Sequence, residues 1–76
     1  MTLKEILPGQ TCLIQSINAE SHLMQRLMDL GLLPGTLAKV VRNAPLKDPM
    51  ELELEGYLIS MRREEADCVL VEACHG

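Results

Sequence analysis

Aromatic residues are nearly absent from this chain, whose 76 residues include one tyrosine and neither phenylalanine nor tryptophan. Its hydrophobic core must therefore be built from leucine, isoleucine, valine and methionine. The same absence removes the stacking surfaces on which single-stranded nucleic acids bind. It also removes the aromatic-lined groove with which several domains bind proline-rich peptides. We expect neither kind of ligand for this protein.

An excess of basic residues is missing as well. Seven lysines and arginines face eleven aspartates and glutamates, so the formal net charge is −4 at pH 7. Nonspecific nucleic-acid binding depends on clustered basic residues that neutralise phosphates, and anionic lipid surfaces attract basic segments. The charge therefore predicts no nucleic-acid partner and disfavours docking on a lipid surface.

Membrane-spanning and secretory segments are not found in the sequence. No apolar run approaches the ~20 residues that a membrane span needs, and the first residues lack the charged-then-apolar layout of a signal peptide. Three cysteines form an odd set, unlike a disulfide framework. We therefore predict a cytoplasmic protein in a reducing environment, with no direct membrane insertion.

Metal-binding and catalytic motifs are missing too. No Cys-x-x-Cys or His-x-x-x-His spacing occurs, although structural zinc sites need four converging ligands. The adjacent Cys74 and His75 are the only weak candidates, and Cys12 is expected in the core. Gly31 and Gly35 fit a helix end and a turn, not a phosphate-binding loop. With little room for a pocket in so short a chain, we predict no enzyme activity, no cofactor and no strong metal site.

Short alternating segments predict a mainly β protein. The clearest runs from Met50 to Leu54, where apolar residues alternate with glutamates. Five strands are expected at 10–17, 36–42, 50–54, 57–61 and 68–72, with one inserted α-helix at about 21–30. A helical turn at 2–5, a polar corner at 62–67 and a frayed tail at 73–76 complete the pattern. Short strands with Gly/Pro turns predict a small five-stranded barrel, with residues 1–76 as a single domain.

The predicted helix has an unusually wide apolar side. Five leucines and methionines between residues 23 and 30 cover an arc of roughly 160°, wider than the ~100° that core packing normally requires. Methionine is common on adaptable binding surfaces, and two leucines extend the apolar area past the helix end. We therefore predict a partner-binding surface at Met24, Met28, Leu32 and Leu33. The alternative is that all four pack on the barrel.

A row of glutamates lies on the outer face of the predicted third strand. Glu51, Glu53 and Glu55 repeat at period two. They suit either a ladder for hard cations or a solvated face paired with Lys39 or Arg42 on the neighbouring strand. We favour the solvated face, because calcium sites need six or more oxygen ligands.

The order of turn, cap and core residues along the chain resembles that of the FeoA family. The members of this family are small cytoplasmic proteins associated with bacterial ferrous-iron uptake. The similar positions are Leu27, Leu30-Gly31, Pro34-Gly35-Thr36, Ala44-Pro45-Leu46, Asp48-Pro49, Gly56-Tyr57 and the segment from Met61-Arg62 to Ala66. The resemblance implies an SH3-like barrel. It also implies a non-enzymatic accessory protein of ferrous iron uptake that docks on the cytosolic part of FeoB, a membrane permease with a GTP-binding domain.

Lys47 departs from the family pattern, which usually has glycine there. A positive φ at this position would strain a lysine by roughly 1 kcal/mol. Two other functions stay open beside the docking role. One is a generic SH3-like protein-interaction module, and the other is a small sensor or chaperone that binds a transition metal through cysteine and histidine.

Overall fold

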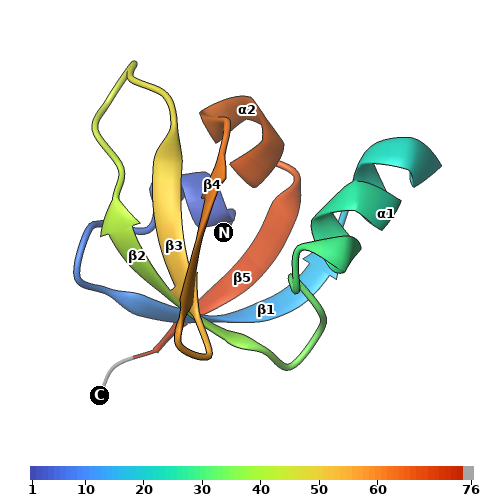
Figure 1. The fold of residues 1–76 in the computed structure, drawn as a ribbon, viewed down its shortest axis with the longest axis horizontal. Helices are drawn as coiled ribbons and strands as arrows, with labels where there is room; N and C mark the ends of the chain where they lie inside the picture. Colours follow the sequence, from blue (N-terminus) through green and yellow to red (C-terminus); the bar gives the residue numbers. More distant parts are fainter. Residues whose placement is uncertain (75–76) are drawn as a thin grey trace.

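The computed structural model describes residues 1–74, which form a strongly curved antiparallel sheet with one main helix at its side (Figure 1). The elements are η1 (Leu3–Glu5), β1 (Thr11–Ile17), α1 (Ser21–Asp29), β2 (Leu37–Arg42), β3 (Met50–Leu54), β4 (Tyr57–Met61), α2 (Arg63–Ala66) and β5 (Val69–Cys74). The five strands follow the order β4-β3-β2-β1-β5 across the sheet. The predicted mainly β fold, with five strands and an inserted helix, is confirmed.

The core lies inside the curve of the sheet and is almost entirely aliphatic. On β3, the inward residues Met50, Leu52 and Leu54 are buried, whereas Glu53 is exposed. The other fully buried large side chains are Leu3, Ile6, Cys12, Ile14, Leu27, Leu32, Val40, Val69 and Val71. Branched and unbranched aliphatic chains thus fill the interior without an aromatic ring, as the composition requires.

The β3–β4 hairpin closes through a two-residue turn. Glu55 and Gly56 both have positive φ angles, 40° and 89°, which matches the twist that two-residue hairpins need. The strands pair from Leu54 opposite Tyr57 to Met50 opposite Met61. The inward residues Met50, Leu52 and Leu54 of β3 therefore lie opposite Met61, Ile59 and Tyr57 of β4.

Helix α1 begins at a carboxylate cap. Glu20 accepts hydrogen bonds from the backbone N–H groups of His22 (2.9 Å) and Leu23, which satisfies two of the free donors at the helix start. These bonds lower the pKa of the Glu20 carboxyl. The helix ends at Asp29, one residue before the predicted boundary. None of the helices in residues 1–74 has the length and hydrophobicity of a membrane span.

One local expectation was wrong, and two others need refinement. The polar corner contains the short helix α2, whose first backbone N–H group donates to Asp48 Oδ1 at 2.7 Å. The expected tail is ordered as far as Cys74, because Ala73 and Cys74 continue β5 and pair with β1. Lys47 does not have a positive φ; the positive φ lies one residue earlier, at Leu46 (59°), so the condition under which the lysine would be strained is not met.

Candidate docking surface

The structure separates the four residues predicted to bind a partner. Leu32 has an exposed fraction of 0%, so its prediction as a contact residue was wrong. Its backbone N–H group donates to Leu27 O (3.2 Å), and that of Gly31 donates to Met28 O (2.9 Å). This hydrogen-bond pair is the Schellman motif, in which the residue after the glycine packs against the last turn of the helix. Leu32 and Leu27 therefore meet in the core.

Met24 and Met28 lie on a flank of α1, beside the helix face that packs on the core through Leu27. Leu27, at the centre of the apolar arc, is fully buried, and Leu23 and Leu30 pack against the core from one flank. The two methionines on the other flank are half-buried, and neither is among the partly buried side chains that pack on the core of residues 1–74. This flank of the helix supplies adaptable apolar area at the surface.

Leu33 is the most exposed of the four predicted residues, with 44% of its surface accessible. It begins the turn that leads to β2, in which Thr36 N–H donates to Leu33 O (3.0 Å) and Gly35 N–H donates to Ile14 O (2.8 Å). Leu37, just beyond this turn, is 55% exposed. Leu37 was not among the predicted surface residues. The inward positions of Ala38 and Val40 on the same strand already implied that Leu37 faces outward.

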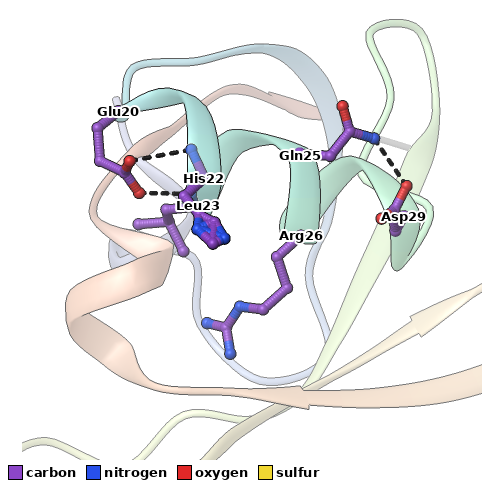
Figure 2. A pocket seen from close by; sticks show the side chains of 6 residues that line it. All are labelled: Glu20, His22, Leu23, Gln25, Arg26 and Asp29. Carbon is purple, nitrogen blue, oxygen red and sulfur yellow. Dashed lines mark hydrogen bonds between the residues drawn. The ribbon is translucent and has the colours of Figure 1, made fainter.

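A shallow hollow of about 530 Å³ lies beside α1 (Figure 2). Its lining residues are Glu20, His22, Leu23, Gln25, Arg26 and Asp29. Most of its polar groups are already engaged, since Glu20 caps the helix, Gln25 Nε2 donates to Asp29 Oδ1 (2.9 Å), and Arg26 forms an ion pair with Glu65 of α2. The hollow therefore offers no set of free groups suited to catalysis.

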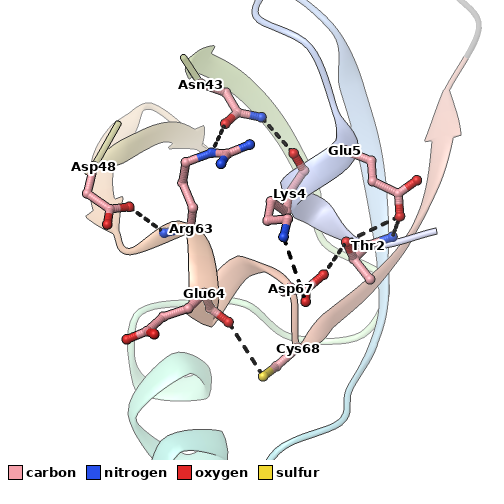
Figure 3. A network of polar contacts seen from close by, with 9 residues as sticks. All are labelled: Thr2, Lys4, Glu5, Asn43, Asp48, Arg63, Glu64, Asp67 and Cys68. Carbon is pink, nitrogen blue, oxygen red and sulfur yellow. Dashed lines mark hydrogen bonds and ion pairs between the residues drawn. The ribbon is translucent and has the colours of Figure 1, made fainter. Parts of the chain in front are cut away.

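A buried amide joins α2 to two other parts of the chain (Figure 3). Asn43 Nδ2 donates to the carbonyl oxygens of Lys4 (2.9 Å) and Ile6 (2.8 Å), and Asn43 Oδ1 accepts from Arg63 Nε (3.0 Å). A buried amide with all of these bonds made stabilises one arrangement of the surrounding loops. The arginines of the corner thus have separate roles, because Arg62 forms an exposed pair with Glu64 (3.6 Å).

The cysteines do not form a metal site in residues 1–74, where no group of three or more potential ligands converges. Cys74 is exposed at the end of β5, and its predicted companion His75 lies outside the described residues. Burial, and to a smaller extent the charge of Cys74, raises the pKa of the Cys12 thiol from 9.0 to about 11. Cys12 is therefore a protonated core residue at neutral pH, as expected.

The glutamates of β3 form a solvated face. Glu51 pairs with Arg42 of β2 at 3.4 Å, and Glu53 lies opposite Lys39 in the β2–β3 register. The pairing with Arg42 is the arrangement that we favoured over a cation ladder.

Comparison with known proteins adds a family match over nearly the whole chain. The model of the FeoA domain matches residues 1–73. A fusion protein of Porphyromonas gingivalis, named Fe(2+) transport protein A/Fe(2+) transporter FeoB, is 32% identical over 72 residues, which cover 95% of this chain. The aligned part is 8% of that fusion protein, so this chain spans a small fraction of its length.

Two solved structures show the same fold. The solution structure of FeoA from Chlorobium tepidum has a TM-score of 0.88 and 43% identity, covering 100% of this chain and 72% of that one. The crystal structure of Stenotrophomonas maltophilia FeoA, complexed with zinc and described as a prokaryotic SH3 domain protein, has a TM-score of 0.83 and 25% identity, covering 95% and 89%. The five-stranded architecture is thus SH3-like.

Proposed function

Because this chain belongs to the FeoA family of non-enzymatic accessory proteins, we propose that it serves ferrous iron uptake by docking on the cytosolic part of a FeoB-type permease. In this proposal residues 1–76 are one FeoA domain that acts in the cytoplasm. It binds a protein partner and performs no chemistry on iron.

The observation that carries the proposal is the fusion protein of P. gingivalis. A segment similar to 95% of this chain is part of the same polypeptide as an Fe(2+) transporter FeoB. Linking two modules in one chain raises the effective concentration of each module near the other, often to the millimolar range. Such a link is useful when the two modules must bind each other to act. A FeoA domain that acts on the permease needs a surface on which the two proteins meet.

We place that surface on the flank of α1 that carries Met24 and Met28 and on the turn that follows the helix. Met24 and Met28 provide adaptable side chains, and Leu33 and Leu37 provide exposed apolar area near the helix end. The helix lies at the side of the curved sheet (Figure 1), where its outer flank can reach a partner without disturbing the core. Leu32 is excluded because it is part of the core.

The proposal is tested by charging this surface. Met28→Glu and Leu33→Glu, made separately, are each expected to weaken binding to the permease at least about 30-fold, because hot-spot residues contribute 2 kcal/mol or more. Binding is measured with the purified permease in detergent or nanodiscs, and ferrous iron uptake is measured in cells that carry each variant. Thermal melting first shows that the variants fold.

Leu46→Glu is the matched control, because Leu46 is 96% exposed but lies in the loop between β2 and β3. It introduces the same charge away from α1. If folded Met28→Glu and Leu33→Glu proteins bind and support uptake as well as the Leu46→Glu protein, α1 is not the docking surface. A wild-type protein that does not bind the permease at all would contradict the proposed function itself.

A further inference from the structure

The two edge strands of the sheet, β5 and β4, differ in whether other residues cover their outer backbone groups. The outer edge of β5 is covered by the N-terminal residues, since Val71 N–H donates to Met1 O (2.9 Å) and Thr2 bridges Leu70. The other edge is β4, which pairs with β3 alone. Within residues 1–74, the β4 backbone makes no backbone hydrogen bond outside that pairing. One edge is therefore closed and the other is open.

The geometry of the hairpin identifies the open groups. A two-residue turn is flanked by a hydrogen-bonded pair, here Leu54 with Tyr57. Hydrogen-bonded and non-bonded pairs then alternate along an antiparallel ladder. Leu58 and Ser60, opposite Glu53 and Glu51, are the non-bonded positions. Their N–H and C=O groups therefore point away from β3, toward the free edge.

β4 carries none of the features that usually protect an edge strand. Its sequence, Tyr-Leu-Ile-Ser-Met, contains no charged residue and no proline, and its pairing with β3 has no bulge. Lysine, proline and bulges are the common means by which proteins prevent an edge from pairing with another chain. Leu58 on the outer face is 61% exposed, so it adds apolar area beside the open backbone groups.

We propose that the free edge of β4 pairs with an extended segment of a partner protein that carries basic side chains at alternate positions. Such strand addition uses main-chain hydrogen bonds for affinity and alternate side chains for specificity. The specificity here comes from Glu53, which lies beside Leu58 on the outer face, and from Glu55 at the turn. Within the described residues, neither carboxylate has an ion-pair partner within 4.0 Å.

The charges also favour a basic segment over a second copy of this chain. Pairing β4 with β4 of another copy would bring two sets of β3 glutamates onto one face of a continuous sheet, and each copy carries a net charge of −4. Like charges near each other oppose association. The open backbone groups belong to Leu58 and Ser60, whereas β4 contacts the end of α1 through the Tyr57 side chain. The inference therefore uses other residues than the docking proposal above and does not depend on it.

The probe is a capped heptapeptide in which lysine and valine alternate. Amide hydrogen exchange of the full chain is followed by NMR as the peptide is added at physiological ionic strength, which screens nonspecific attraction. At a peptide concentration about ten times Kd, roughly 90% of sites are filled, and exchange at Leu58 and Ser60 should slow about tenfold. Leu52, an inner ladder residue, is the internal reference.

Two altered peptides separate backbone pairing from simple charge attraction. A version N-methylated along one edge keeps every charge but loses the hydrogen bonds of that edge, and we expect its binding to fall at least about tenfold. A version with glutamate in place of lysine should bind at least about tenfold more weakly than the basic peptide. Equal binding of either altered peptide overturns the proposal.

Leu58→Lys supplies the test from the protein side. The exposed position tolerates the change. The new positive charge should weaken binding of the lysine peptide and strengthen binding of the glutamate peptide. Leu58→Thr, the neutral control, should keep the preference for the lysine peptide. Unchanged preference in a folded Leu58→Lys protein overturns the proposal. Protection of Leu58 and Ser60 that rises with protein concentration alone would show that a second copy occupies the edge, which also overturns it.

Discussion

The hydroxyl of Tyr57 donates a 2.9 Å hydrogen bond to the carbonyl oxygen of Leu30. The last carbonyl groups of a helix have no partner within it, and here the only aromatic residue of the chain reaches one of them from the β3–β4 hairpin. Gly31 lies directly beneath, with φ of 109°, and a Cβ atom there would collide with the Tyr57 hydroxyl. The end of α1 and the start of β4 are therefore joined at a point where only glycine fits.

We predict that Gly31→Ala and Tyr57→Phe are coupled. Tyr57→Phe should cost about 1 kcal/mol of unfolding free energy through the lost hydrogen bond. Gly31→Ala should cost more than the roughly 1–2 kcal/mol of a left-handed alanine, because of the added collision. In the Tyr57→Phe background that excess should shrink, so the two costs are not additive. Urea denaturation of the two single variants and the double variant measures the coupling.

Gly35→Ala is the control for this experiment, because Gly35 has a similar φ of 90° but no atom within 4 Å of the added Cβ. It should show the backbone cost alone, with no dependence on Tyr57. Purely additive costs for Gly31→Ala and Tyr57→Phe would contradict the close contact.

Leu52 is predicted to be a central core residue of β3. Its side chain is fully buried, so Leu52→Ala should lower the unfolding free energy by about 2–5 kcal/mol. Leu58→Ala, on the exposed face of the neighbouring strand, should change it by no more than about 0.5 kcal/mol. Chemical denaturation distinguishes the two, and similar losses at both positions would mean that the strand register is wrong.

Leu32 and Leu33 should respond oppositely to the same substitution. Leu32→Glu places a carboxylate in an aliphatic core, which costs several kcal/mol and should abolish the cooperative thermal transition of so small a domain. Leu33→Glu should melt within about 4 °C of the wild type. Circular dichroism during heating measures both. A folded Leu32→Glu protein would restore Leu32 as a surface residue and contradict the Schellman motif.

Cys12 should make the protein less stable at high pH. Its pKa rises from 9.0 to about 11 on folding, so the folded state holds the thiol proton more tightly than the unfolded chain. The resulting stability, roughly 2–3 kcal/mol, is fully present below pH 9 and is lost as the pH rises to about 11. Cys12→Ala should lack this part of the pH dependence. Urea midpoints of both proteins across this range test the prediction, and parallel curves would contradict it.

Much of the fold was predictable because its strands are buried on one face only. The alternation of Met50, Leu52 and Leu54 with glutamates defines which side of β3 faces the core, and the positive φ of Gly56 marks the hairpin. The order of strands across the sheet was not predicted, because pairing between distant segments leaves no local pattern. Helix α2 was missed since its four charged and small residues show no apolar period.

The candidate surface was only partly predictable, and the error lay at the helix end. Leu32 and Leu33 look equivalent as neighbouring leucines, but the left-handed Gly31 sends the first into the core and leaves the second exposed. Reading Gly31 as part of a Schellman motif would have separated them from sequence. The hydrogen bond from Tyr57 to Leu30 joins residues 27 positions apart, which no local rule reveals.

The position of β1 between β2 and β5 has a consequence for synthesis of the chain. β1 is the first strand to be made, but one of its two partners, β5, is the last. The side-chain amide of Asn43 can bond to Lys4 O of the N-terminal turn early, but its bond from Arg63 of α2 can form only after Arg63 has been made. Contacts so distant in sequence slow folding. Until residues 69–74 have left the ribosome, β1 keeps an open edge, and this is the stage at which the nascent protein most needs protection from aggregation.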